Sequence, residues 1–77
     1  MKTSIAELRS AVKAKNMYRG IVNPEWNVVG SIKIGGDTSG ITIYEVINIG
    51  GGVRRVIYGA TKSEAIQAVY DIPNEVI

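Results

Sequence analysis

The sequence contains no cysteine and no histidine among its 77 residues, and it has no phenylalanine. Without cysteine the chain can form no disulfide, and without both residue types it lacks the usual ligands of zinc. The same absences remove the commonest general base and the thiol nucleophile of enzymes. We therefore expect a non-enzymatic protein with no metal and no cofactor, stabilised by apolar packing or self-association.

Long apolar runs are also missing. No segment approaches the about 18 apolar residues of a transmembrane helix, and Glu7 and Arg9 interrupt the stretch where a signal peptide needs an apolar centre. These patterns predict a cytoplasmic protein without a membrane partner. The length predicts a single domain. The net charge of +2 permits a nucleic-acid partner without requiring one.

Two capping boxes mark the starts of two predicted helices. Ser4 and Glu7 begin the first, and Thr61 and Glu64 begin the second. Apolar residues at helical spacing follow each box, which predicts a helix at about 4–16 and another that ends at Pro73.

Between the helices the sequence favours strands. Alternating or β-branched segments predict them at Trp26–Ile34, Ile41–Ile49 and Val53–Ala60, with glycine-rich loops at Gly35–Gly40 and Gly50–Gly52. Short loops suit hairpins. We expect an α+β fold in the order helix, three-stranded antiparallel meander, helix, with both helices on one face of the sheet.

Glu45 interrupts the apolar face of the second predicted strand. A bulge could turn it to solvent, or it could pair across the sheet with Arg54 or Arg55. A functional carboxylate is the third interpretation.

Basic and aromatic residues are interleaved on the predicted sheet. Lys33 and one of the two adjacent arginines can share its open face, with Trp26 and either Tyr44 or Tyr58 nearby. Such a surface can bind phosphates and stack bases, although an ordinary solvated face would show the same pattern. The candidate nucleic-acid-binding residues are Arg19, Trp26, Lys33, Arg54, Arg55 and Lys62.

The segment Arg54–Ala65 resembles the strand-to-helix junction of phage integrase arm-type DNA-binding domains. These are similar to the plant ethylene-response-factor domain, whose opening resembles Tyr18-Arg19-Gly20-Ile21. The resemblance implies a three-stranded sheet in the major groove of DNA. Its DNA-facing residues would be Arg19, Trp26, Lys33, Arg54 and Arg55. The chain differs from that family in an additional N-terminal helix and a more apolar middle strand.

A protein-binding module is the alternative function. The order of elements is also similar to double-stranded-RNA-binding domains, of whose lysine cluster only Lys62 is present, and to small phage-type inhibitors of host proteins. The strand Ile41–Ile49 is apolar on both faces, which one layer of helices cannot cover. A host protein, or a second copy in a homodimer, could contact Ile41, Ile43, Tyr44 and Val46.

Overall fold

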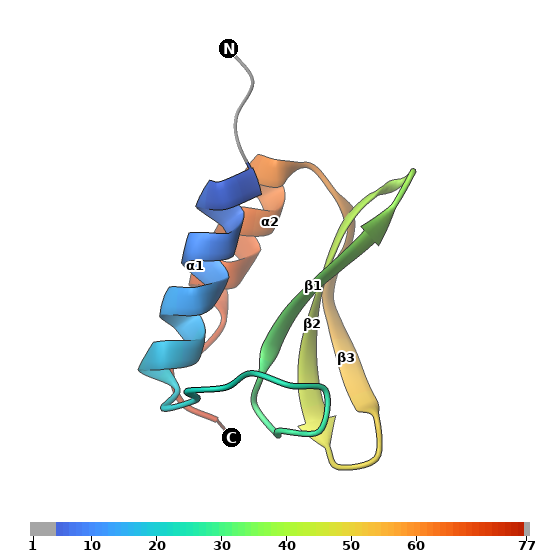
Figure 1. The fold of residues 1–77 in the computed structure, drawn as a ribbon. Helices are drawn as coiled ribbons and strands as arrows, with labels where there is room; N and C mark the ends of the chain where they lie inside the picture. The colour runs from blue at the N-terminus through green and yellow to red at the C-terminus, as the bar shows by residue number, and fades with distance from the viewer. Residues whose placement is uncertain (1–4, 77) are drawn as a thin grey trace.

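The computed structural model describes residues 5–76 and contains five elements in the predicted order. They are α1 (Ile5–Tyr18), β1 (Ile32–Asp37), β2 (Gly40–Asn48), β3 (Gly52–Ala60) and α2 (Lys62–Asp71). The strands form one antiparallel sheet in the order β1-β2-β3. Both helices lie side by side on one face of this sheet (Figure 1), which confirms the predicted fold class.

The core lies between the helices and the sheet. In the β1–β2 ladder, Ile32 is opposite Glu45 and Ile34 is opposite Ile43. Because successive side chains of a strand alternate between faces, these residues all point toward the helices. The buried apolar cluster consists of Leu8, Ala11, Val12, Ile32, Ile43, Ala60, Ala65, Val69 and Ile72.

Local hydrogen bonds define the ends of α2. The Thr61 hydroxyl accepts from the Glu64 amide at 3.2 Å, and the Glu64 carboxylate accepts from the Thr61 amide at 2.9 Å. The predicted second capping box is therefore confirmed. The helix ends at Asp71, two residues before Pro73, which cannot donate the hydrogen bond that would extend it. The first predicted box includes Ser4, which lies outside the described residues.

The predicted strand Trp26–Ile34 is wrong in its first half. Residues 26–30 form turns, and β1 begins only at Ile32. Gly30 adopts a φ of 94°, which interrupts the extended conformation before the strand starts. A Cβ atom at Gly30 would also lie 2.5 Å from a methyl group of Val76, so the chain passes the C-terminal segment closely here.

The predicted loop Gly35–Gly40 is also too long. Gly35 and Gly36 are paired with Thr42 and Ile41 in the β1–β2 ladder. The hairpin turn itself is confined to residues 38–39. Glycine composition alone suggested a loop, but the ladder hydrogen bonds continue through both residues.

Candidate nucleic-acid interface

The face of the sheet that points away from the helices carries a row of basic and aromatic side chains. Lys33 of β1 is directly opposite Tyr44 of β2, and Tyr44 is directly opposite Arg55 of β3. Directly opposed residues share one face of a sheet. Glu45, the neighbour of Tyr44, points toward the helices, so these three side chains occupy the open face.

Two further rings extend this row at its ends. The Trp26 ring meets Tyr44 edge to face at a centroid distance of 5.5 Å, and the Lys33 ammonium lies 5.7 Å from the Trp26 centroid. On β3, the Arg55 guanidinium lies 5.0 Å from the Tyr58 centroid. We call Trp26, Lys33, Tyr44, Arg55 and Tyr58 the aromatic–basic row.

The row is held in place by the backbone around it. Trp26 belongs to the loop between α1 and β1, where the Glu25 amide donates to the Ser31 hydroxyl at 3.1 Å. Lys33 donates to the Pro24 carbonyl at 3.4 Å, which ties the loop to β1. Trp26 therefore reaches the open face from a loop, although the sequence predicted it on a strand.

The Tyr44 ring lies over a glycine. A Cβ atom at Gly35 would be 2.7 Å from Cε2 of this ring, so only glycine leaves the space that the ring occupies. An aromatic ring over a glycine on the neighbouring strand covers backbone that would otherwise be exposed to solvent. Sequence reasoning did not single out Gly35, whose place diagonally across from Tyr44 follows only from the strand register.

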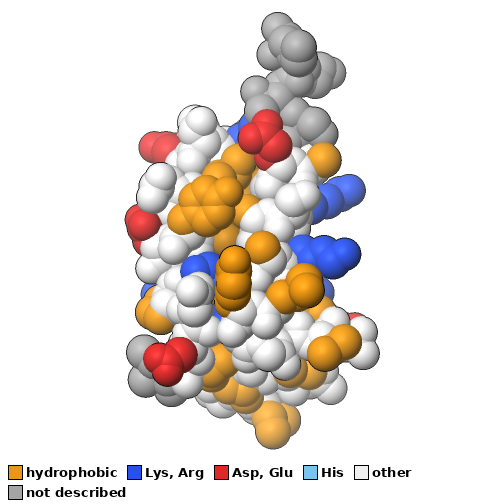
Figure 2. Space-filling model, turned by 90° about the vertical axis from the view of Figure 1, so that its left-hand side faces the viewer, with side chains coloured by type: hydrophobic (Ala, Val, Ile, Leu, Met, Phe, Trp, Pro, Cys, Tyr) orange, Lys and Arg blue, Asp and Glu red, His pale blue; other side chains and the backbone are white. Residues whose placement is uncertain are grey.

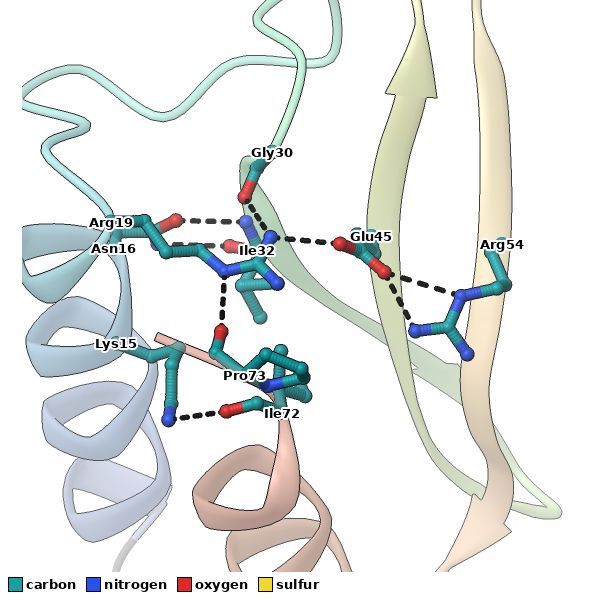
Figure 3. A network of polar contacts seen from close by, with 9 residues as sticks. All are labelled: Lys15, Asn16, Arg19, Gly30, Ile32, Glu45, Arg54, Ile72 and Pro73. Atoms are coloured by element: carbon teal, nitrogen blue, oxygen red, sulfur yellow. Dashed lines mark hydrogen bonds and ion pairs between the residues drawn. The ribbon is translucent and has the colours of Figure 1, made fainter. Parts of the chain in front are cut away.

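Arg19 and Arg54 lie on the other side of the sheet, where both bind Glu45 (Figure 3). Arg19 Nη1 is 2.8 Å from one carboxylate oxygen, and Arg54 Nη2 is 2.6 Å from the other. Of the three interpretations of Glu45, the structure shows the pairing with an arginine of the next strand, and this arginine is Arg54. Burial raises the pKa of Glu45, but hydrogen bonds and positive charge from the two arginines outweigh this effect and lower that pKa overall.

Arg19 is the more deeply buried of the two partners. Its side chain is 1% exposed, whereas that of Arg54 is 52% exposed. Arg19 also donates to the carbonyl oxygens of Gly30 at 2.9 Å and Pro73 at 3.0 Å. It joins α1 to the sheet and to the segment after α2.

The other candidate residues lie apart from the row. Lys62 begins α2 and is partly buried. Of the proposed protein-contact residues, Ile43 is fully buried in the core and Ile41 packs against it. Tyr44 belongs to the row. Val46 lies on the same face of the sheet as Tyr44 but is buried, so the face that points away from the helices is covered at this end and open only around the row. The structure therefore brings Trp26, Lys33 and Arg55 together and separates them from Arg19, Arg54 and Lys62.

Residues 5–76 contain neither a membrane-spanning helix nor a metal site built from acidic residues. None of the helices there is both long and apolar enough to cross a membrane. The acidic residues described form no group of three that could hold a metal ion. Comparison of the chain with protein-family models, curated proteins and solved structures gives no match.

Proposed function

We propose that this protein is a non-enzymatic module that binds DNA through the open face of its sheet. The observation that carries the proposal is the aromatic–basic row, in which cations and rings alternate across all three strands. Lys33 and Arg55 supply two positive charges, and Trp26 and Tyr58 supply exposed rings.

The chemistry of the row matches that of a nucleic-acid strand. Lysine and arginine bind phosphate oxygens, whereas aromatic rings stack on bases at about 1–3 kcal/mol per base. The two cations stand on strands separated by β2, which places their backbones about 10 Å apart. A DNA strand lying across the sheet would meet positive charge at Lys33 and Arg55, with the rings of Trp26 and Tyr58 beside these two cations.

The resemblance to the integrase arm-type domains supports DNA as the ligand. In that family the three-stranded sheet is the surface that meets DNA. Of the residues that the resemblance implies, our proposal retains Trp26, Lys33 and Arg55. It leaves out Arg19 and Arg54, because both guanidinium groups are engaged by Glu45.

The adjacent arginines of β3 provide a matched test. Arg55→Ala and Arg54→Ala remove the same charge from neighbouring positions on opposite faces of one strand. We expect Arg55→Ala to weaken binding of a fluorescently labelled DNA about tenfold and to lower the slope of log K against log salt by about one. Arg54→Ala should bind as the unchanged protein does.

Fluorescence anisotropy at low salt, with single-stranded and duplex DNA measured separately, gives both quantities. Trp26 is the only tryptophan, so its emission reports directly on the row. The proposal is wrong if neither form of DNA binds at micromolar protein, or if the two arginine variants lose affinity equally while remaining folded.

A further inference from the structure

The outer face of the helical layer, opposite the open sheet face, carries exposed apolar side chains. Tyr18 in the last turn of α1 is 71% exposed, and Tyr70 in the last turn of α2 is 63% exposed. Met17 is 67% exposed and lies nearer the edge of the face, where it lines a hollow together with Lys13. Figure 2 looks onto this face and shows hydrophobic side chains over its middle. Basic side chains gather at its right-hand edge and acidic ones toward its left-hand edge, with one further acidic side chain in the upper middle and a basic one left of centre.

The basic edge belongs to α1. Arg9 and Lys13 are four residues apart and therefore lie on the same side of the helix. Lys13 lines a surface hollow together with Lys33 and Ile34 of β1, so this side of α1 is the one beside β1. Both residues are exposed.

The acidic edge belongs to α2. Asp71 lines a different hollow together with Arg54 and Val56 of β3, so it lies on the β3 side of the helix. Glu64 is seven residues earlier, which places it on the same side two turns away. Both acidic residues are exposed. The two charged edges thus flank the apolar middle of the face.

The two edges also match in height along the helices. Lys15 donates to the carbonyl oxygens of Tyr70 and Ile72, so it is level with the end of α2, and the two helices run in the same direction (Figure 1). With a rise of 1.5 Å per residue, Lys13 lies about 3 Å from that level toward the N-terminal ends of the helices, and Arg9 lies about 9 Å from it in the same direction. Glu64 lies about 10 Å above Asp71 by the same arithmetic.

We propose that a second copy of this chain docks on the helical face, with the two-fold axis parallel to α1 and α2. A half-turn about this axis keeps every height and exchanges the two edges. Lys13 then faces Asp71 of the second copy, and Arg9 faces Glu64 of the second copy. A half-turn about an axis across the helices would instead bring like charges together, which is unfavourable.

The size of the face sets the expected affinity. Two helices, of which α1 has 14 residues, present a surface of about 20 Å by about 20 Å. That surface is at the low end of specific interfaces, where contacts are weak and reversible. We expect a monomer–dimer equilibrium in the micromolar range that weakens as salt is added, because the edges contribute through charge. This dimer is independent of the proposed DNA site, which it leaves exposed on both copies.

Charge reversal tests both the interface and its symmetry. Lys13→Glu and Asp71→Lys each create two repulsive pairs per dimer, so each variant should raise the dimer Kd at least about tenfold. An equimolar mixture of the two variants restores both attractive pairs and should form a heterodimer. The double variant, with both changes in one chain, should form a homodimer again. Arg55→Glu, the control of similar charge change on the opposite face, should leave the Kd unchanged.

Sedimentation velocity over a range of concentrations measures each Kd, and circular dichroism verifies folding. A wild-type protein that is monomeric at every concentration would refute the proposal. Reversals that leave the Kd unchanged would place the contact elsewhere and overturn it equally. Failure of the mixture and of the double variant to dimerise would exclude the proposed axis.

Discussion

Arg19→Met should destabilise the protein far more than Arg54→Met, although both arginines bind the same carboxylate. Methionine keeps much of the apolar length of the side chain and removes the guanidinium. In Arg19→Met, Glu45 loses the partner at 2.8 Å, and the carbonyl groups of Gly30 and Pro73 lose their donor. In Arg54→Met, Glu45 keeps Arg19.

The magnitudes follow from burial. Removing one partner of a buried ion pair costs about 3–5 kcal/mol, and the Arg19 side chain is 1% exposed. An exposed pair contributes about 0–1 kcal/mol, and the Arg54 side chain is 52% exposed. A domain of this length has a total stability of only about 4–12 kcal/mol. Arg19→Met therefore removes a large part of the free energy of unfolding.

Urea denaturation followed by circular dichroism measures both changes, provided that the m-value stays constant. A third variant, Glu45→Gln, keeps a hydrogen-bonding side chain and separates the charge effect from the geometry. Equal losses in the two arginine variants, or a loss below about 1 kcal/mol for Arg19→Met, would show that the buried network does not hold α1 to the sheet.

Three further predictions concern pH, the open face and the helix cap. Because the pKa of Glu45 is lowered in the folded state, this group stabilises the fold above its unfolded pKa of about 4.3, and the contribution is lost as pH falls through the lower folded pKa. In Glu45→Gln, the free energy of unfolding measured with urea should therefore fall less steeply between neutral and acidic pH. Gly35→Ala should displace the Tyr44 ring, change Trp26 emission and weaken DNA binding. In a double-mutant cycle, the same change should cause little further loss of DNA affinity when Tyr44 is already alanine. Thr61→Ala should cost about 1 kcal/mol in thermal unfolding, and a loss equal to that of Ser63→Ala would argue against the cap.

The fold was predictable because its signals are local. The capping box at Thr61 and Glu64, the helical spacing of apolar residues and the two glycine-rich turns each act within a few residues. The start of β1 was not predictable from alternation, because residues 26–30 fit the alternating pattern in the sequence yet form turns. The left-handed conformation of Gly30 ends the turns. The sequence alone did not reveal this, because a glycine within a strand pattern can mark a bulge, a bend or a close approach of another backbone.

The sequence predicted which kinds of residue form the candidate site, but not which of the basic residues belong to it. The pattern placed Lys33, Trp26 and an arginine near one another, and the structure brings Trp26, Lys33 and Arg55 together. Which of the two adjacent arginines joins them depends on the register of β3 against β2. Register is set by long-range pairing and by the irregularities in this ladder, so the sequence could not assign it.

The last turn of α1 has consequences for how the chain reaches its native state. Lys15 finds its acceptor at Ile72, 57 positions later, and Asn16 binds both backbone groups of Ile32. A contact as distant in sequence as that of Lys15 forms late and slowly, because most of the chain must be ordered before it closes. During synthesis on the ribosome, Lys15 can obtain its acceptors only after residues 70–74 have emerged. Although α1 is made before the sheet and α2, its last turn is therefore among the last parts of this fold to be secured, and this turn and that of α2 should exchange amide hydrogens as one unit.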